Sequence, residues 1–566
     1  MESTDKVSCN IIVSLLVKHG VEEVVVSPGS RNAPLVLAMS RCGALKKTVV
    51  IDERSAAFIA LGKASVSGKP VALVCTSGTA VLNYAPAVAE AYYRRVPLIV
   101  ISADRPMEWI DQDDSQTLRQ YEALSHYVKR SYNIPADCSA DNMQWYTNRV
   151  VNDALLCAVS GRRAPVHINV QLDNPLDGMA CLDDTRWTSR DITRLSAQQR
   201  LSHEDMALLA GRCGARSKIM IIAGFMEPDN ELLDALKRLA ACDDVVVMTE
   251  TVANLPSDMF IGCIDATLSV MDDVRRHDMR PDIVITVGGA IISRFIKQYL
   301  RTADIKEHWH VGLTDDTVDC FRNLTVSINM APERFFKDLA EALPKADGSR
   351  CSFRKEWHEV AAEGEKVHER YLASVPWCDL TAMRYVFNNL PEGCNIQLSN
   401  GTSVRYAQLF PSAAAARCDC NRGVSGIDGS TSTAVGASTV YDGITLLITG
   451  DMSAQYDIGA LAAPCITPRF KMIVLCNGGG GIFRFIKSTS KLDELDEYFV
   501  VDRPFPIAKL ADAYGFRYFE AHDEYSLSAL FGGFIEEKDR PAILAIYTSS
   551  ETSAKCLGAY FGCKLT

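Results

Sequence analysis

Two polar side chains follow two apolar runs near the carboxyl end of the sequence, each where a strand is expected to stop. Asp451 follows "ITLLITG", and Asn477 follows "FKMIVLC". Because ligands collect at the carboxyl ends of strands in parallel sheets, we expect both side chains to face one site. A carboxylate and an amide oxygen, joined by glycine carbonyls and phosphate oxygens, form a ligand set that suits Mg²⁺.

Four consecutive glycines, residues 478–481, come directly after Asn477. Glycine loses more conformational freedom on folding than any other residue, so either the loop is slack or something approaches the main chain closely. A diphosphate fits, because backbone N–H groups can then reach it without a Cβ in the way. Two alternatives stay open: Asp451 as the cap of a helix near Ser453, and a dinucleotide site, although the glycines lack the G-x-G-x-x-G spacing.

The strands that must position these residues fall into three sets. The first runs from "VEEVVVS" to "PLIVISAD", the second from "IMIIAGF" to "HWHVGL", and the third from "NIQLSN" to "PAILAIYT". Continuous apolar strands indicate sheets that are covered on both faces by helices. We therefore predict an α/β protein with three doubly wound parallel-sheet domains, at residues 1–182, 183–352 and 353–566.

Two polar segments separate these sets. Residues 183–200 are predicted to form a linker, and residues 353–373 are predicted to form a charged, solvated helix that leads into the third domain.

Composition narrows the function classes. The net charge of −11 over 566 residues argues against general binding to nucleic acid or to a membrane surface. We find no signal-peptide pattern and no apolar run of about 20 residues, so no membrane span is expected. The 19 cysteines include no CxxC pair, which indicates reduced thiols in the cytoplasm. Cys418 and Cys420 could form half of a zinc site, but no second pair lies near them in the sequence.

Asp451 and Asn477 together resemble the metal–diphosphate motif of thiamine-diphosphate enzymes, although Met452 stands where that motif usually has glycine. The resemblance implies that thiamine diphosphate is bound with Mg²⁺ (or Mn²⁺). The implied metal ligands are Asp451, Asn477 and the carbonyl of Gly479. Further cofactor contacts are implied for Gly401, where the family often has serine, and for Met452, Ser453 and Gly481.

The same resemblance gives Glu53, in "TVVIDERSAAF", a role in the first domain. In these enzymes a glutamate donates a hydrogen bond to N1′ of the aminopyrimidine ring and so activates the cofactor. The alternative is that Asp52 and Glu53 only offset the dipole at the start of a helix.

A narrower resemblance covers both outer domains. The segments "VSPGSRNAPL", "IDERSAAF", "DSQTLRQ" and "NRGVSGIDGSTSTAVGAS" are similar to those of the 2-succinyl-5-enolpyruvyl-6-hydroxy-3-cyclohexene-1-carboxylate (SEPHCHC) synthases of menaquinone biosynthesis. The likeness is weaker in the middle domain, where "VGGAIISRF" carries it. It implies a transferase that decarboxylates 2-oxoglutarate and adds the resulting four-carbon carbanion equivalent to isochorismate.

Two polycarboxylate substrates need cations, and arginine suits them because its planar fork donates two parallel hydrogen bonds. Arg31, Arg105, Arg405 and Arg422 all lie beside predicted turns. The resemblance places further residues near the substrates or the cofactor: Ser30, Gln116, Arg294, Ile427, Ile482 and Phe483. Two positions depart from the family, since Ser115 replaces the usual asparagine and Phe295 replaces a second basic residue.

Glu53 and the metal residues belong to different predicted domains. Enzymes of this family place the cofactor between two subunits, so a homodimer or a dimer of dimers is implied. Two alternatives stay open. An acetohydroxyacid synthase or another 2-oxo acid decarboxylase would share Glu53, Asp451 and Asn477 but should lack the arginines of "SPGSR" and "NRGVSGIDG". A non-catalytic binding protein on the same scaffold would not need Glu53.

Overall fold

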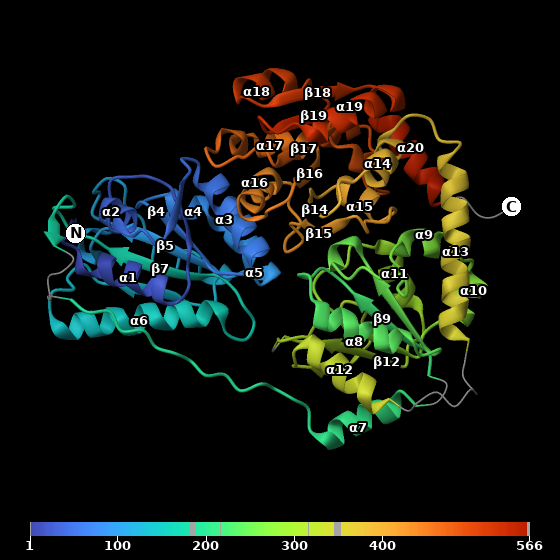
Figure 1. Cartoon of the computed structure of the whole chain (residues 1–566), viewed down its shortest axis with the longest axis horizontal. Helices are drawn as coiled ribbons and strands as arrows, with labels where there is room; N and C mark the ends of the chain where they lie inside the picture. The colour runs from blue at the N-terminus through green and yellow to red at the C-terminus, as the bar shows by residue number, and fades with distance from the viewer. Residues whose placement is uncertain (1, 182–186, 215–216, 315, 344–351, 563–566) are drawn as a thin grey trace. The chain divides into compact units, whose positions relative to one another are not determined.

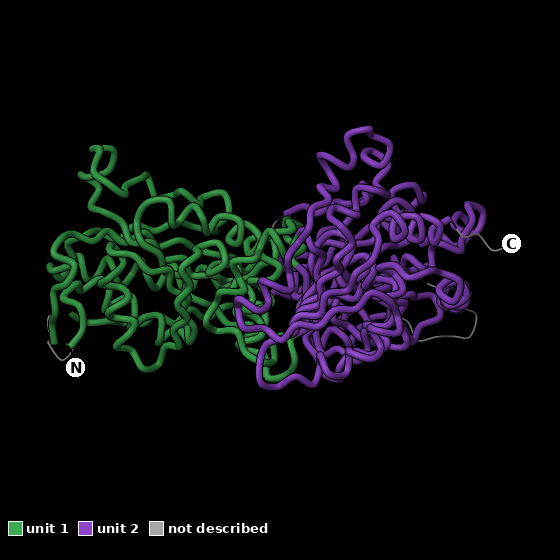
Figure 2. Tube along the Cα trace, turned by 90° about the horizontal axis from the view of Figure 1, so that it is seen from above, with its two compact units in different colours: residues 1–196, 421–445, 453–470 green, residues 197–420, 446–452, 471–566 purple. Residues whose placement is uncertain are grey.

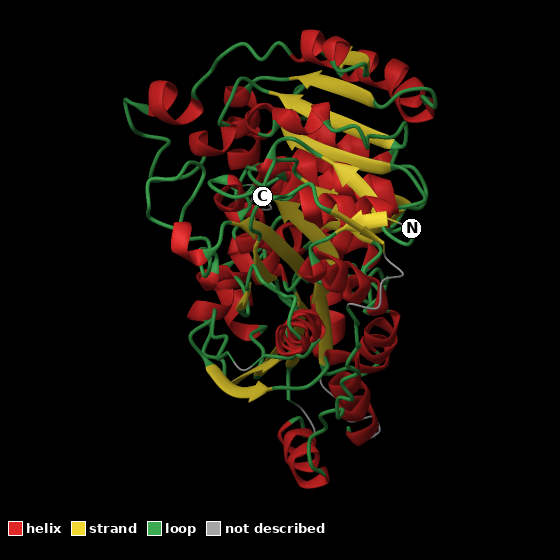
Figure 3. Cartoon of the chain, turned by 90° about the vertical axis from the view of Figure 1, so that its left-hand side faces the viewer, coloured by secondary structure: helices red, strands yellow, loops and turns green. Residues whose placement is uncertain are grey.

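The computed structural model describes the chain except residues 1, 182–186, 215–216, 315, 344–351 and 563–566. Its described residues form three sheets of five or six strands and one small two-stranded sheet (Figure 1). Helices lie on either side of the strands (Figure 3). The predicted α/β class with parallel sheets is confirmed.

The first sheet has six strands, all paired in parallel. Its central strands are buried along their whole length, as the continuous apolar runs predict. The order across the sheet is β3 (Lys46–Val49), β2 (Glu23–Val26), β4 (Val71–Cys75), β5 (Leu98–Asp104), β7 (Val166–Gln171) and β6 (Ser131–Ile134). The helices that accompany it are α1 (Val7–Lys18), α2 (Ala33–Arg41), α3 (Glu53–Ser67), α4 (Ala80–Asn83), α5 (Ala85–Arg94) and α6 (Asp141–Val159).

The second sheet is also parallel and has five strands. The order is β10 (Val245–Thr249), β9 (Ile219–Ala223), β11 (Ile283–Val287), β12 (Glu307–Val311) and β13 (Leu324–Ile328). Its helices are α7 (His203–Arg212), α8 (Asn230–Ala240), α9 (Ile264–Ser269), α10 (Asp273–Asp278), α11 (Arg294–Thr302) and α12 (Pro332–Ala342).

The third sheet carries the predicted metal residues and has six strands. The order is β15 (Ala415–Cys420), β14 (Cys394–Leu398), β16 (Thr445–Gly450), β17 (Phe470–Cys476), β19 (Ala542–Tyr547) and β18 (Arg517–Ala521). Its helices are α14 (Asp379–Asn388), α15 (Ser403–Ala407), α16 (Ser430–Val440), α17 (Asp451–Tyr456), α18 (Ile507–Ala513), α19 (Glu524–Glu536) and α20 (Ser550–Tyr560). Because β16 and β17 are neighbours, Asp451 and Asn477 lie directly after the ends of adjacent strands.

The two polar segments take different forms. The described part of the predicted linker has no regular structure, and Asn148 and Asn152 of α6 hold it by hydrogen bonds to Thr188, Arg190 and Ile192. Helix α13 (Phe353–Leu372) forms as predicted but is not simply solvated. Its apolar face, which includes Phe353 and Trp357, is buried. The remaining two-stranded sheet pairs β1 (Glu2–Thr4) with β8 (Met179–Cys181) in antiparallel fashion.

The chain divides into two compact units that do not follow the order of the sequence (Figure 2). Unit 1 contains residues 1–196, 421–445 and 453–470, and unit 2 contains residues 197–420, 446–452 and 471–566. The domain boundaries suggested above remain predictions. Among the residues the structure describes, every helix is too short or too polar to span a bilayer.

Within unit 1, helices α3 and α16 touch backbone to backbone. A Cβ at Gly62 would lie 2.0 Å from the carbonyl oxygen of Thr433, and a Cβ at Gly436 would lie 2.0 Å from that of Ile59. Only glycine allows this approach. The contact ties the helix that begins with Glu53 to a helix almost 400 positions later in the sequence.

Gly436→Ala is therefore expected to destabilise the protein by about 1–3 kcal/mol through overpacking, with a lowered melting temperature in thermal denaturation. Gly532→Ala is the matched control, because Gly532 lies in helix α19 with open space around it. That control should be neutral or stabilising by at most about 1 kcal/mol. Equal melting temperatures for the two variants would contradict the close backbone contact between α3 and α16.

Candidate active site

Asp451 is held in a cradle of backbone N–H groups. It is the first residue of α17 and is 8% exposed. Its Oδ2 accepts hydrogen bonds from the N–H groups of Gly478 and Gly479, each at 3.0 Å, and its Oδ1 accepts one from Met452 at 2.8 Å. The carboxylate thus joins the ends of β16 and β17 and has one fixed orientation.

The glycine run is already required by the protein's own backbone. Gly478 and Gly479 have φ values of +87° and +116°, which favour glycine. A Cβ at Gly479 would lie 2.2 Å from the carbonyl oxygen of Val500, and one at Gly480 would lie 2.5 Å from that of Phe499. The close approach expected from the sequence therefore occurs to residues 499–500. Contact with a diphosphate remains a prediction.

Asn477 presents an unsatisfied oxygen. Its Nδ2 donates to Oδ2 of Asp379 at 2.8 Å, whereas its buried Oδ1 accepts no hydrogen bond from any residue that the structure describes. A buried acceptor without a partner costs free energy. A cation bound between Oδ1 of Asn477 and the buried carboxylate of Asp451 would give both groups a partner.

The raised pKa of the Asp451 carboxyl is also consistent with a cation site. Burial raises the pKa of the Asp451 carboxyl to about 6, against the opposing effect of its three backbone N–H donors. A nearby cation would favour the ionised form. The carbonyl of Gly479 accepts the N–H of Gly481 at 2.8 Å and keeps a second lone pair for a metal.

The other predicted residues of unit 2 lie on separate turns and short helices. Gly401 has φ +100° in the turn after β14. Ile482 and Phe483 lie half-buried in the 3₁₀ turn η5 (Gly481–Arg484), with the ring of Phe483 5.6 Å from that of Phe499.

Two of the arginines that are predicted to bind substrate lie in helices of unit 2. Arg294 is the exposed first residue of α11. Arg405 lies in α15, close enough to Asp265 for its charge to lower the pKa of that carboxyl, although burial dominates and raises it.

In unit 1 the structure brings Arg31 and Arg105 together. Arg31 is 6% exposed, and it donates from its backbone N–H to Thr76 and from its guanidinium to the carbonyl of Leu172. Burial, and next the charge of Arg105, lower the pKa of Arg31. Ser30 immediately precedes Arg31 in the turn between β2 and α2.

The loop after β5 folds back over this pair. Arg105 forms an ion pair with Asp114 at 2.8 Å and donates to the carbonyl of Ser115 at 3.0 Å. Gln116 takes a positive φ of 58° and donates to the carbonyl of Ser77 at 3.2 Å. These contacts hold the loop against the ends of neighbouring strands.

Gln120 also holds this loop, although it is not one of the predicted site residues. Its Oε1 accepts the N–H of Gly78 at 2.7 Å, and its Nε2 donates to the carbonyl of Ala103 at 3.0 Å. Its place in the segment "DSQTLRQ" is the signal that could have selected it.

Glu53 begins helix α3, but Asp52 makes the cap. Asp52 accepts the N–H of Arg54 at 3.0 Å. The half-buried Glu53 has no hydrogen-bond partner among the described residues. Its charge contributes to the raised pKa values of Cys75 and Tyr84, where burial is the larger cause. Capping therefore explains Asp52 and leaves the carboxylate of Glu53 available.

The segment with Arg422 and Ile427 is anchored in unit 1. Both carboxylate oxygens of the buried Glu90 accept backbone N–H groups, from Gly423 and Val424, at 2.7 Å each. Ile427 is 38% exposed, and its carbonyl accepts the Ser453 hydroxyl at 2.7 Å.

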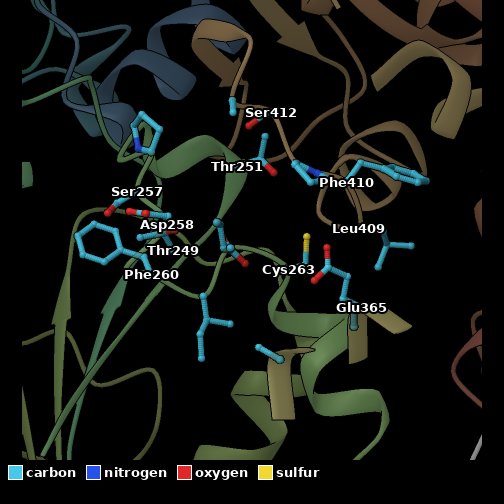
Figure 4. Close-up of a pocket in the computed structure, with 18 of the residues that line it drawn as sticks. Thr249, Thr251, Ser257, Asp258, Phe260, Cys263, Glu365, Leu409, Phe410 and Ser412 are labelled. Carbon is cyan, nitrogen blue, oxygen red and sulfur yellow. The ribbon is translucent and has the colours of Figure 1, made fainter. Parts of the chain in front are cut away.

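A cavity of about 750 Å³ in unit 2 contains none of the predicted site residues (Figure 4). Asp258, Glu365 and Phe410 are among the side chains around it. Its arginines are engaged elsewhere, Arg417 with Asp419 and Arg384 with Glu524. This cavity therefore does not match the cationic site that a dicarboxylate needs.

The described residues also contain no cluster of three or more His, Cys, Asp and Glu side chains that could hold a metal. Cys418 and Cys420 are buried thiols in β15, without such a cluster around them.

Comparison with known proteins identifies the family. Residues 9–123 match the family model "Thiamine pyrophosphate enzyme, N-terminal TPP binding domain", and residues 182–367 match "Middle domain of thiamine pyrophosphate". The SEPHCHC synthase of Porphyromonas gingivalis is 39% identical over 564 residues, which cover 99% of this chain and 97% of that protein.

Two further relatives carry the same name. The protein from Bacteroides thetaiotaomicron is 34% identical over 99% of both chains, and that from Christiangramia forsetii is 34% identical over 97% of both. With likeness along nearly its whole length, the chain belongs to the SEPHCHC synthase family of thiamine-diphosphate-dependent enzymes.

Proposed function

We propose that this chain decarboxylates 2-oxoglutarate with thiamine diphosphate and adds the four-carbon carbanion equivalent to isochorismate, forming SEPHCHC in menaquinone biosynthesis. The observation that carries the proposal is the 39% identity to a SEPHCHC synthase over 99% of the chain. An acetohydroxyacid synthase is not favoured, because the relatives compared above all carry the SEPHCHC synthase name.

For the metal, we assign Asp451, Asn477 and the carbonyl of Gly479 as ligands of Mg²⁺ or Mn²⁺. The unpaired Oδ1 of Asn477 supports this assignment. When bound, thiamine diphosphate supplies the electron sink that the decarboxylation needs. Glu53 would donate a hydrogen bond to N1′ of its aminopyrimidine ring. Gly401, Ile427, Met452, Ser453 and Gly481 are the remaining assigned contacts.

For the substrates, Arg31, Arg105, Arg294, Arg405 and Arg422 would bind carboxylates. Arg105 already pairs with Asp114, so a substrate carboxylate must share or displace that contact. Ser30 and Gln116 would lie near the reacting carbon, and Ile482 and Phe483 would form an apolar wall that excludes water.

For the assembly, we propose a homodimer or a dimer of dimers in which Glu53 of one subunit and Asp451 of another serve one cofactor. Glu53 belongs to unit 1 and Asp451 to unit 2, which is compatible with such sharing.

No nucleic-acid partner is proposed, in line with the net charge of −11. We also propose a cytoplasmic location, on the basis of the cysteine usage.

The direct test supplies the purified protein and thiamine diphosphate with 2-oxoglutarate, with and without isochorismate. We expect SEPHCHC, identified by mass spectrometry, only when both substrates are present. Efficient acetolactate formation from pyruvate, with no SEPHCHC, would instead assign the acetohydroxyacid synthase reaction.

Glu53→Gln should lower turnover by about 10²- to 10⁴-fold, the range for loss of an acid–base group. Thiamine diphosphate should still bind, as measured by fluorescence titration. Asp52→Asn is the matched control, since it changes the adjacent carboxylate but keeps a side chain that can cap α3. Near-normal turnover of Glu53→Gln would remove its catalytic assignment.

A mixing experiment tests the shared site. Glu53→Gln and Asp451→Ala should each be nearly inactive, whereas co-expression should restore about one quarter of normal activity, since half of the dimers are mixed and each has one intact site. No recovery, with mixed dimers demonstrated by differential tags, would show that both residues act from the same subunit.

A further inference from the structure

We propose that Asp379 is a positioning residue that fixes the side-chain amide of Asn477, so that Oδ1 of Asn477 faces the metal. The inference rests on the proposed metal site. It adds to that site a residue from a separate helix, which neither the motif nor the family likeness singled out.

Asp379 lies in a fully formed polar pocket within unit 2. It is the first residue of α14 and is 1% exposed. Its Oδ2 accepts Nδ2 of Asn477 at 2.8 Å, and its Oδ1 accepts the hydroxyl of Thr548, at the end of β19, at 2.5 Å. Its backbone N–H donates to the hydroxyl of Ser553 in α20 at 3.0 Å.

The chemistry of these groups determines the orientation of the amide. An ionised carboxylate only accepts hydrogen bonds, whereas an asparagine amide has a donating end and an accepting end. Asp379 therefore selects the NH₂ end of Asn477. The oxygen is directed away from Asp379, and it is the atom that is buried without a partner among the described residues.

The surroundings of Asn477 leave little freedom for another arrangement. Asn477 is 7% exposed, and its backbone carbonyl accepts the N–H of Ser550 at 3.1 Å. A Cβ at Gly481 would lie 3.2 Å from Nδ2 of Asn477, so the last glycine of the run leaves the space that the amide occupies.

Asp379 itself is not assigned as a metal ligand. Its two oxygens already accept hydrogen bonds from Asn477 and Thr548. The start of α14 also stabilises a negative charge at this position through the helix dipole. Both features suit a buried anion that orients a neighbour, as outer-shell partners of metal ligands do.

The test measures metal binding directly. Mn²⁺ is titrated into full-length protein saturated with thiamine diphosphate, and free Mn²⁺ is followed by electron paramagnetic resonance. Asp379→Asn should raise the Kd for Mn²⁺ by about 10- to 100-fold, the usual effect of losing an outer-shell partner. Thr548→Val is the control, because it alters the same pocket but keeps the contact between Asp379 and Asn477. Its Kd should change less than about threefold.

An exchange of the two groups separates positioning from general packing. The double variant Asp379→Asn with Asn477→Asp keeps the charge and re-forms the hydrogen bond with donor and acceptor reversed. It should bind Mn²⁺ at least about tenfold more tightly than either Asp379→Asn or Asn477→Asp alone, a coupling that independent sites do not show. Melting curves of the metal-free proteins report whether each variant is folded.

The outcomes are distinguishable. If Asp379→Asn binds Mn²⁺ as tightly as the parent protein, or if the exchanged pair recovers nothing, the positioning role is overturned while the proposed function stands. If the parent protein binds no Mn²⁺ with thiamine diphosphate, the proposed metal site is itself wrong. Should Asp379→Asn not fold, the comparison of the exchanged pair with Asn477→Asp alone decides, because both carry a carboxylate at position 477 and only the exchanged pair re-forms the hydrogen bond.

Discussion

The candidate site depends on one buried interaction, the carboxylate of Asp451 accepting the N–H groups of Gly478 and Gly479. It joins the ends of two neighbouring strands and sets the path of the glycine loop. Without it, two backbone donors would be left unpaired in a partly buried turn, which is costly. The backbone positions of Asn477 and of the carbonyl of Gly479 follow from this geometry, whereas the side-chain amide of Asn477 is held by Asp379.

Other loops that carry proposed substrate-binding arginines are held by buried carboxylates in the same way. Glu90 accepts two N–H groups of the segment that carries Arg422. Glu250, at the end of β10, accepts the N–H groups of Ile292 and Ser293, just before Arg294. Burial raises the pKa of Glu250 to about 7, against these opposing hydrogen bonds. Loops that present charged side chains are thus pre-organised by acceptors behind them, which reduces the ordering that ligand binding must impose.

The sequence predicts the sheets and motif residues well because the central strands are continuous apolar runs that end in turn residues. It does not predict β7 or β15, whose polar side chains find partners inside the fold. In β7, His167 contacts Ser102, and in β15, Arg417 pairs with Asp419. The charged pattern of α13 predicts a solvated helix, yet Trp357 is fully buried. The residue pattern does not reveal such cases, because polar residues usually face water. Here their hydrogen-bond partners elsewhere in the fold allow them to be buried.

The glycine contact between α3 and α16 has a consequence for how the molecule is made. Unit 1 needs residues 421–470 to complete it, apart from the few that belong to unit 2. At typical translation speeds, α3 leaves the ribosome on the order of tens of seconds before α16 exists. During that interval the narrow glycine face at Gly62 has no covering helix. The packing of α3 is therefore completed only after α16 (Ser430–Val440) has been synthesised, so unit 1 cannot reach its final form from the amino-terminal segment alone.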